Sequence, residues 1–355
     1  MTTFPELSCT VVAPSSLGGM TPTVRIDLAR LDANIAAMAA QPGQLRPHVK
    51  THKIPEIARR QLAAGAHGLT VATVGEAEAF ATVCGDLFIA YPVWADKRLR
   101  DLATQVRLTI GCDSLTAAER LVGAKVGVLI ELDSGHHRSG VPVGELEDLA
   151  RGILDLGLDL RGAFTFPGHS YTPDGQEAAA RDEDQALSAA GQILRALGVA
   201  APVLSGGSTP SARYSQVATE RRPGVYVFND AQQLELGTCD WSGIALTVRA
   251  TVVSRRTDLH QVIVDAGSKI LGSDRPAWAS GFGRIKGVPD ARLTALSEHH
   301  GTVAWPEGKP LPQVGEQVAV VPNHVCLVLN LVDEVEVVSG GRVVDRWAVA
   351  ARGRN

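Results

Sequence analysis

The sequence predicts an α/β protein: a (β/α)8 barrel of the TIM type, followed by a mostly-β domain at the C-terminus. Short apolar runs of strand length alternate with longer Ala- and Leu-rich amphipathic stretches through residues 21–240, a pattern typical of βαβ units and a parallel sheet. Eight such runs occur, which is the strand number of a closed barrel. Beyond residue 240 helical periodicity weakens, and β-branched runs are broken by Gly, Pro and Asp.

The barrel strands are expected where the apolar runs lie. These runs are Leu45–Lys50, Gly68–Ala72, Leu87–Ala90, Arg107–Gly111, Val126–Leu132, Leu160–Phe166, Pro202–Ser205 and Pro223–Val227. Helices are expected ahead of the first run and between the others, at 28–40, 54–64, 75–83, 96–103, 114–122, 144–155, 175–197 and 209–217. An open doubly wound sheet is the alternative architecture for the same alternation, and the eight repeats favour the barrel.

The second domain is expected to be built from β-strands. Its β-branched runs are Ala245–Ser254, Gln261–Asp265, Gln317–Val321, Val325–Asn330 and Glu334–Val338. We therefore expect a barrel domain over residues 21–240. The β domain is expected over residues 241–355, together with residues 1–20.

Composition excludes several classes of protein. The 355 residues are 45% hydrophobic and 20% charged, which is ordinary for a globular chain, and the net charge is −4. No long basic run is present, so a nucleic-acid or anionic-membrane partner has no support. There is no secretory signal pattern and no apolar stretch long enough to span a membrane, so we expect a cytoplasmic protein. The five cysteines are scattered and include no CxxC pair, so they do not indicate a disulfide framework. They are Cys9, Cys84, Cys112, Cys239 and Cys326.

Catalytic groups of a β/α barrel come from the C-terminal ends of its strands. The first run ends in Arg46-Pro47-His48-Val49-Lys50-Thr51-His52-Lys53, with two lysines and two histidines in six residues. A desolvated lysine amine loses its proton readily and can form a Schiff base. A solvated basic turn before a helix is the alternative interpretation.

Two further strand ends carry polar side chains. The fifth run ends in the loop Asp133–Gly140, which contains Arg138, and the sixth is followed by His169 and Tyr171. Each loop is either a simple turn or part of a site. Their places after barrel strands favour a site at the mouth of the barrel.

The seventh run leads into a Gly-Gly segment with hydroxyl residues, which predicts a phosphate site. Adjacent glycines let backbone N–H groups approach an anion, and the expected helix at 209–217 would add its dipole. The loops after strands seven and eight are common phosphate sites in barrels. Tyr226, within the eighth run, and Asn229, directly after it, could donate to the same phosphate.

The β domain offers a metal-ligand pair. On a strand, residues i and i+2 face the same side, so His324 and Cys326 could share one metal ion. Imidazole with thiolate suits Zn²⁺ better than Mn²⁺ or Mg²⁺. A buried cysteine beside a solvated histidine is the alternative. A Schiff-base lysine, a phosphate site and a barrel mouth together indicate pyridoxal 5′-phosphate.

These motifs resemble a known family. The chain resembles the fold-type III pyridoxal-phosphate enzymes, with their alanine-racemase-like barrel and β domain, and within them the D-serine dehydratase and D-threonine aldolase family. The resemblance extends from Thr21 to the end. It is carried by the segment at Lys50, Pro167-Gly168-His169-Ser170-Tyr171, Arg222–Asp230 and Pro322-Asn323-His324-Val325-Cys326.

The resemblance implies a role for each candidate residue. Lys50 would bind the cofactor covalently and Lys53 would only begin a helix, while Arg138 would lie beside the pyridine nitrogen. His169 and Tyr171 would face the substrate, with Tyr171 also near the cofactor, and a divalent metal on His324 and Cys326 would lie beside its β-hydroxyl. The phosphate would be held by Ser205, Gly206, Gly207, Ser208, Thr209, Tyr226 and Asn229.

The implied activity is that of a lyase on D-3-hydroxy amino acids, and a homodimer is expected by resemblance alone. We expect D-serine-type dehydration to a 2-oxo acid and ammonia, because His-x-Cys resembles the dehydratase branch and His-x-Asp the aldolase branch. D-threonine aldolase, and D-3-hydroxyaspartate aldolase or dehydratase, stay open as alternatives. His299 in Ser297-Glu298-His299-His300 departs from the family pattern, which has an acid there.

Three other classes of protein are weighed against the lyase. A racemase needs no metal directed at a hydroxyl. A pyridoxal-phosphate carrier or homeostasis protein resembles the barrel without the β domain. A cofactor-free metal hydrolase on a barrel would lack the near-visible absorption of bound cofactor.

Overall fold

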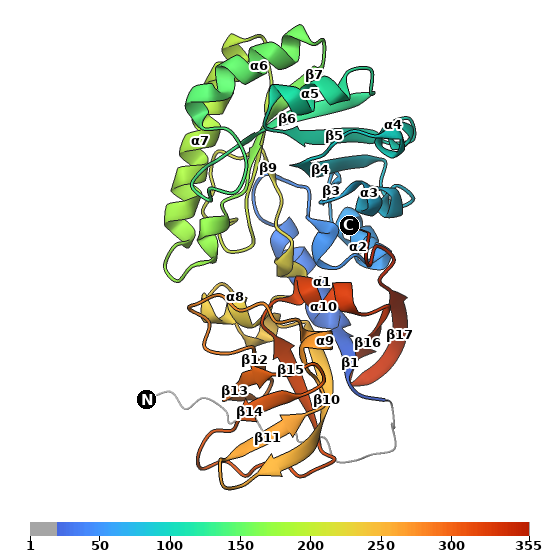
Figure 1. Cartoon of the computed structure of the whole chain (residues 1–355), viewed down its shortest axis with the longest axis vertical. Helices are drawn as coiled ribbons and strands as arrows, with labels where there is room; N and C mark the ends of the chain where they lie inside the picture. The colour runs from blue at the N-terminus through green and yellow to red at the C-terminus, as the bar shows by residue number, and fades with distance from the viewer. Residues whose placement is uncertain (1–19, 355) are drawn as a thin grey trace. The chain divides into compact units, whose positions relative to one another are not determined.

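The computed structural model describes residues 20–354, and the chain divides into two compact units (Figure 1). The barrel unit comprises Asn34–Tyr226 and the residues from Ala350 onward; the β unit comprises the described residues up to Ala33 and Val227–Val349. The boundaries expected at residues 21 and 240 were therefore misplaced. The cause at the N-terminus is that Thr23–Asp27 forms a strand of the β unit. Of the expected segment 1–20, residues 1–19 lie outside the described residues.

The barrel unit contains eight parallel strands in the order β2-β9-β8-β7-β6-β5-β4-β3. An isolated parallel bridge between His48, which follows β2, and Thr70 of β3 joins the two ends of this sheet. The predicted barrel is thereby confirmed. Its strands are β2 (Gln44–Leu45), β3 (Leu69–Val71), β4 (Asp86–Pro92), β5 (Arg107–Cys112), β6 (Val126–Leu132), β7 (Asp159–Thr165), β8 (Val203–Gly206) and β9 (Glu220–Arg221).

Helices follow most of these strands, and Figure 1 shows α3–α7 on the outer side of the sheet. Helix α1 (Leu28–Ala39) precedes β2. The helices that follow barrel strands are α2 (Pro55–Ala63), α3 (Val74–Phe80), α4 (Lys97–Leu102), α5 (Leu115–Leu121), α6 (Leu146–Asp155) and α7 (Gln176–Ala196). Side chains of Thr73, Asp96 and Ser114 accept hydrogen bonds from the first turns of α3, α4 and α5, which explains why those helices begin there. None of the described helices is both long enough and apolar enough to cross a membrane.

The barrel core has an outer and an inner part. All seven residues of β6 are buried, as expected for a parallel strand covered on both faces. Inside the barrel, Phe88, Leu129 and Phe164 form a separate cluster. The buried Arg222 guanidinium stacks on two of these rings, 5.6 Å from the Phe88 centroid and 5.2 Å from the Phe164 centroid. The apolar layer therefore supports a buried cation next to the functional end of the barrel.

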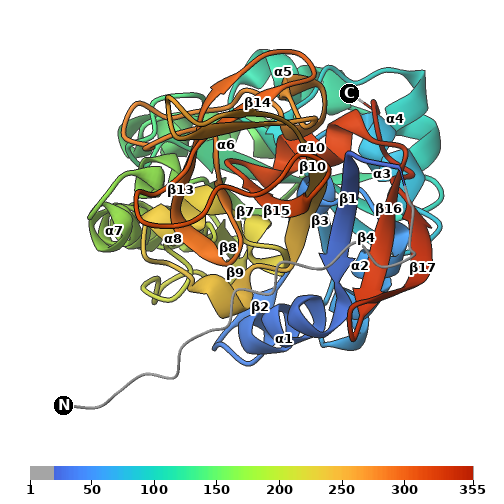
Figure 2. The same ribbon diagram turned by 90° about the horizontal axis from the view of Figure 1, so that it is seen from below.

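The β unit is a nine-stranded sheet, in which β1 (Thr23–Asp27) lies between β10 and β16 (Figure 2). The other strands are β10 (Leu246–Arg256), β11 (Gln261–Val264), β12 (Gly283–Ile285), β13 (Val288–Leu296), β14 (Gly301–Ala304), β15 (Gln317–Pro322), β16 (Glu334–Ser339) and β17 (Arg342–Ala348). Three short helices accompany them: α8 (Ala231–Glu235), α9 (Ser268–Leu271) and α10 (Val325–Leu331). The expected β domain is confirmed, with more strands than the sequence predicted.

Four predicted elements were wrong. Of the first predicted strand, Leu45–Lys50, only Leu45 belongs to β2, and Val49–Thr51 forms a 3-10 turn. The run Val325–Asn330 forms helix α10 and not a strand, because a short apolar run that is buried has no periodicity to separate the two states. The eighth strand is Glu220–Arg221, and most of the predicted run 223–227 is instead a 3-10 turn over Val225–Val227. No helix forms at 209–217, where turns lead from β8 to β9.

Candidate active site

The ring of Phe166, directly after β7, lies near three of the predicted site residues, Lys50, Arg138 and Tyr171. Lys50 Nζ lies 5.9 Å and the Arg138 guanidinium carbon 5.2 Å from its centroid. The His136 ring meets it edge-on at 5.5 Å, and the Tyr171 ring lies 6.3 Å away. Three different loops at the C-terminal ends of strands thus converge on one aromatic platform. Phe166 itself was not a predicted site residue, because an aromatic residue ending a strand looks like core.

Lys50 and Lys53 have different surroundings although both belong to the basic motif. Lys50 lies in the 3-10 turn Val49–Thr51 and is partly exposed at the Phe166 platform. Lys53 is buried, and its Nζ pairs with Glu76 Oε1 at 3.3 Å. Glu76 also accepts from Ala72 N–H. Lys53 therefore has a structural ion pair in the core, whereas Lys50 is the more exposed lysine and lies at the barrel mouth.

His48 shows that cations gather at this end of the barrel. Burial lowers the pKa of His48 well below its ordinary value, and the charges of Lys50, Arg222 and Arg138 lower it further. The imidazole is therefore neutral at physiological pH. Three positive groups around a neutral histidine leave a positive potential that suits a phosphate or carboxylate ligand.

Arg138 is oriented by the strand that precedes it. Its Nη2 lies 3.9 Å from Glu131 Oε1, which also accepts from Ser139 Oγ at 2.9 Å. Burial raises the pKa of Glu131, while Ser139 and the cations oppose that shift. The loop side chains are thus anchored on the end of β6, as the sequence predicted for a site at a strand end.

His169 and His136 pack reciprocally on glycines of each other's loops. A Cβ added to Gly135 would lie 3.2 Å from His169 Cε1, and one added to Gly168 would lie 2.5 Å from His136 Nδ1. His169 Nε2 is 3.1 Å from Asp182 Oδ2, and its buried Nδ1 has no hydrogen-bond partner among the described residues. The glycines therefore leave room for each histidine to pack against the other loop, and His169 retains one nitrogen for a ligand.

The Gly-Gly loop after β8 is rich in hydroxyl side chains, and these hydroxyls differ in their hydrogen-bond partners. Ser205 Oγ donates to Glu220 and accepts from Arg222, so we withdraw its hydroxyl from the phosphate site and assign it to the strand core. Ser208 Oγ hydrogen-bonds with Ser170 Oγ and Ser211 Oγ, each at 2.8 Å. Since no helix follows, the expected helix dipole cannot contribute to an anion site here.

Thr209 and Tyr226 meet next to this loop. Thr209 Oγ1 accepts from Tyr226 N–H at 3.1 Å. The buried Tyr226 hydroxyl accepts from Gln61 Nε2 at 2.9 Å, and Gln61 Oε1 lies 3.2 Å from His52 Nε2. Burial lowers the pKa of His52 to about 4, which keeps this chain of hydrogen bonds neutral. Gln61 and His52 therefore hold Tyr226 in place, a role that a glutamine inside an amphipathic helix gives no sequence signal for.

Asn229 lies in the β unit, where its side-chain amide donates to Gly243 O at 3.1 Å. The backbone of Asn229 is left-handed, with φ of 51°. Its assignment to the phosphate stays a prediction.

The pair His324 and Cys326 stands at the start of α10, with His324 as the N-cap residue. The expected i, i+2 strand geometry was wrong, yet the two side chains hydrogen-bond each other. His324 Nδ1 also lies 3.2 Å from Oδ2 of Asp230, a fully buried residue that caps α8. Partial burial lowers the pKa of His324, but Cys326 and Asp230 outweigh it and raise the pKa well above its ordinary value.

This donor set fits a divalent metal ion. A negative site that holds a proton on the imidazole also attracts a cation, and imidazole with thiolate is a zinc donor set. Asp230 occupies Nδ1, which leaves His324 Nε2 as the ligand atom. Among the described residues no group of three or more His, Cys, Asp or Glu side chains is arranged to hold a metal. The protein would therefore supply two ligands and leave the other positions for water or substrate.

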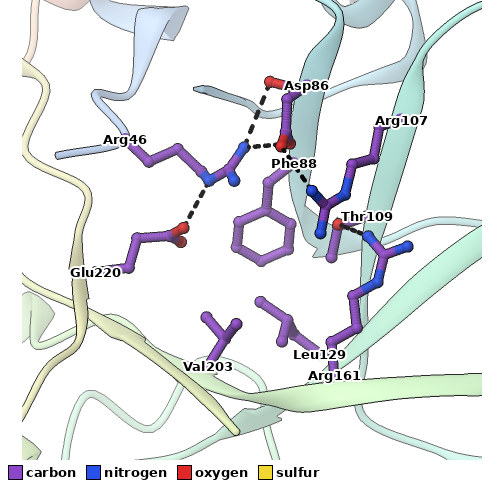
Figure 3. A pocket seen from close by; sticks show the side chains of 9 residues that line it. All are labelled: Arg46, Asp86, Phe88, Arg107, Thr109, Leu129, Arg161, Val203 and Glu220. Atoms are coloured by element: carbon purple, nitrogen blue, oxygen red, sulfur yellow. Dashed lines mark hydrogen bonds and ion pairs between the residues drawn. The ribbon is translucent and has the colours of Figure 1, made fainter. Parts of the chain in front are cut away.

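A cavity elsewhere in the barrel unit is not this site. Four of its lining residues, Asp86, Arg107, Val203 and Glu220, each begin a strand (Figure 3). Its arginines have partners; Arg46, for example, donates to Glu220 and Asp86. Catalytic groups of barrels lie at the opposite strand ends. We therefore assign this cavity to the structural core.

Comparison with known proteins agrees with the geometry. Residues 26–232 match the family model "Alanine racemase, N-terminal domain", and residues 245–338 match "Putative serine dehydratase domain". D-threo-3-hydroxyaspartate dehydratase of Delftia sp. (strain HT23) is 36% identical, over 86% of this chain and 90% of its own length. D-threonine aldolase of Arthrobacter sp. is 34% identical, over 94% and 93%. The solved structure of the Delftia dehydratase covers 93% of this chain and 97% of its own, with a TM-score of 0.84 and 34% identity.

The fold and the comparisons define a pyridoxal-phosphate-dependent lyase with an alanine-racemase-like barrel. The chain belongs to the D-serine dehydratase and D-threonine aldolase family of fold-type III enzymes. Solved structures of the Delftia dehydratase include one with alanine for a histidine and a metal-free one with alanine for the cysteine two positions on. The family therefore includes metal-binding members.

Proposed function

We propose that this enzyme dehydrates D-3-hydroxy amino acids, with D-serine as the simplest substrate, to a 2-oxo acid and ammonia. The observation that carries the proposal is the pairing of two features in one chain. The barrel unit gathers Lys50 and Arg138 at the Phe166 ring, and the β unit holds His324 with Cys326. The names of the two relatives above give D-3-hydroxy amino acids as their substrates, which supports the same substrate class here.

The barrel residues fit pyridoxal 5′-phosphate. This cofactor supplies an aldehyde that bonds to amines and a ring that withdraws electrons from bonds at the substrate Cα. Lys50 would hold it covalently and Arg138 would bind the ring. Thr209, Tyr226 and the Gly206–Ser208 loop would hold the phosphate, with Asn229 a further candidate. The positive potential around His48 favours such an anion.

Lys50 Nζ is the base that we assign to the Cα proton. It is partly exposed, and its Nζ lies 5.9 Å from the centroid of the Phe166 ring at the C-terminal ends of the barrel strands. Arg138, on the same ring, would keep a substrate or cofactor anion oriented while the proton moves. Tyr171 packs at a tilt beside the Phe166 ring, 6.3 Å between centroids, and would help to exclude water from it.

His324 Nε2 and the Cys326 thiolate would hold the metal ion, for which we propose zinc. Such an ion supplies a Lewis acid that helps a β-hydroxyl leave as hydroxide. Asp230 would keep the proton on Nδ1 of the imidazole, so that Nε2 is the nitrogen that binds the ion.

Retro-aldol cleavage is the second candidate, and His169 is the observation that favours it. Its Nε2 faces Asp182, and its Nδ1 has no partner among the described residues. This arrangement suits a base that takes a proton from a β-hydroxyl, which is the first requirement of aldol cleavage.

Incubation with D-threonine separates the two reactions. Dehydration predicts 2-oxobutanoate and ammonia in equal amounts, and His169→Asn should retain most of this activity. Glycine and acetaldehyde without ammonia, abolished by His169→Asn, would show that aldol cleavage is the reaction.

A further inference from the structure

The loop between β8 and β9 has no helix to fix it, although the phosphate site is assigned to its first residues. Two consecutive acids on α7, Glu183 and Asp184, hold it instead. They bind the loop at its two ends, so its shape is determined by a helix that supplies no direct ligand. Nothing in the proposed reaction uses either acid.

Glu183 holds the Gly206-Gly207 end of the loop. Its side chain is fully buried, and Oε1 accepts a hydrogen bond from Gly207 N–H at 2.5 Å. A Cβ on Gly206 would lie 1.9 Å from that same oxygen, so only glycine leaves room for the carboxyl group. Gly207 adopts a left-handed φ of +83°, which also favours glycine. The Gly-Gly pair is therefore matched to Glu183.

Asp184 holds the far end of the loop. Its carboxylate accepts from Ser215 Oγ at 2.9 Å, and from the backbone N–H groups of Gln216 and Val217. Between the two ends, Ser208 bonds with Ser170 and Ser211, and Thr209 accepts from Tyr226 N–H. With both ends fixed, the hydroxyls of the loop are held in one arrangement.

We propose that Glu183 is a positioning residue for the phosphate end of the cofactor, acting through Gly206 and Gly207 on the placement of Ser208 and Thr209. This inference rests on the proposed function, because it assigns the phosphate to this loop. Burial raises the pKa of Glu183 to about 8, while Gly207 N–H and the Arg222 charge oppose the shift and Asp184 adds to it. A carboxyl group that is mostly neutral at pH 7 does not repel a phosphate dianion.

The test compares pyridoxal 5′-phosphate with pyridoxal, which has the aldehyde and lacks the phosphate. The full-length protein freed of cofactor is titrated with each, and the absorption band of the lysine-bound form gives the affinity. Glu183→Ala is expected to lower the affinity for pyridoxal phosphate by about 10-fold to 100-fold, which is the scale of losing a supporting hydrogen bond. The affinity for pyridoxal should stay within about twofold of the wild type. Glu183→Gln keeps an acceptor for Gly207 N–H and should stay within about threefold of the wild type for both ligands.

Two further variants complete the design. Gly206→Ala displaces the Glu183 carboxyl group from the other side, and should give the same phosphate-selective loss even if Glu183→Ala does not fold. Glu177→Gln removes an exposed α7 acid paired with Arg181, and should change neither affinity.

Equal losses for both ligands, or none in Glu183→Ala and Gly206→Ala, would overturn the positioning role while leaving the proposed function intact. Failure of the wild type to bind pyridoxal phosphate would overturn the proposed function and this inference with it.

Discussion

At the scale of single residues, the chemistry depends on which of several similar side chains is available. Lys50 and Lys53 lie three positions apart in one motif; Lys53 is buried and pairs with Glu76, whereas Lys50 is partly exposed beside the Phe166 ring. The sequence could predict the motif and Lys50 by resemblance. It could not predict Asp230, Glu183 or Gln61, because the partners of these residues lie far away along the chain. A buried acid inside an amphipathic helix such as α7 has no sequence pattern that separates it from a solvated one.

Lys50→Ala should abolish the near-visible absorption band of bound cofactor, whereas Lys53→Met should keep it. Lys53→Met should instead lower the free energy of unfolding by about 3–5 kcal/mol, since it leaves the buried Glu76 carboxylate unpaired. Absorption after dialysis and urea unfolding measure the two effects. Loss of the band in Lys53→Met with Lys50→Ala unaffected would show that the assignment is reversed.

Asp230→Asn should weaken zinc binding by about 10-fold to 100-fold, because the outer-shell carboxylate that orients His324 becomes a neutral amide. Asparagine still caps α8, so the fold should be retained. Competition with a chromophoric chelator measures the affinity. Asp240→Asn, at an exposed cap, is the control, and equal zinc affinity in both variants would rule out the role of Asp230.

At the scale of elements, the sequence predicted most of the barrel correctly, and its errors have physical causes. The run Val126–Leu132 matches β6 because a strand buried on both faces is a continuous apolar run. The same signal was misleading at Val325–Leu331, which is a buried helix. The segment 209–217 forms no helix, because the Asp184 carboxylate and local serine hydroxyls accept hydrogen bonds from backbone N–H groups in and next to it. Such side-chain hydrogen bonds compete with those of a helix. The place of β1 depends on strand pairing that no local pattern encodes.

Glu220, the first residue of β9, accepts hydrogen bonds from Arg46, which follows β2, and from Ser205 of β8. Its ionisation should make the stability of the fold sensitive to acid. Burial alone would raise its pKa, but His67, Arg46 and Ser205 lower the pKa to about 2. An unfolded glutamate has a pKa of about 4.3, so the stabilisation is present above that pH and is lost as the pH falls toward 2.

Glu220→Gln should therefore lower the free energy of unfolding by about 3–5 kcal/mol at pH 7, and the difference from wild type should shrink below pH 4. Urea unfolding across this pH range measures it. Glu147→Gln, in an exposed pair with Arg151, is the control and should change stability by less than about 1 kcal/mol. A difference that stays constant from pH 7 to pH 3 would contradict the pKa assignment.

At the scale of the whole molecule, the candidate groups are divided between the two units. Lys50, Arg138, Thr209 and Tyr226 lie in the barrel unit, whereas Asn229 and the proposed metal pair lie in the β unit with Asp230. The sequence predicted the lysine in the barrel domain and the metal pair in the β domain, but it placed Asn229 in the barrel domain because it set the boundary at 240. Cofactor and metal should therefore be separable by experiment.

Exhaustive chelation should remove activity and leave the cofactor absorption unchanged, and Cys326→Ala should behave like the chelated protein. Metal analysis, absorption and turnover are measured on the same sample, and added zinc should restore the wild type but not the variant. Full activity with no metal remaining would exclude the metal from the reaction.

The most direct measurement of the proposed dehydration is product formation from D-serine by the full-length protein supplied with pyridoxal phosphate and zinc. The proposal predicts pyruvate and ammonia in equal amounts, no turnover of L-serine, and loss of both products in Lys50→Ala and in Cys326→Ala. Glycine formed without ammonia, or pyruvate formed equally well by Lys50→Ala, would contradict it.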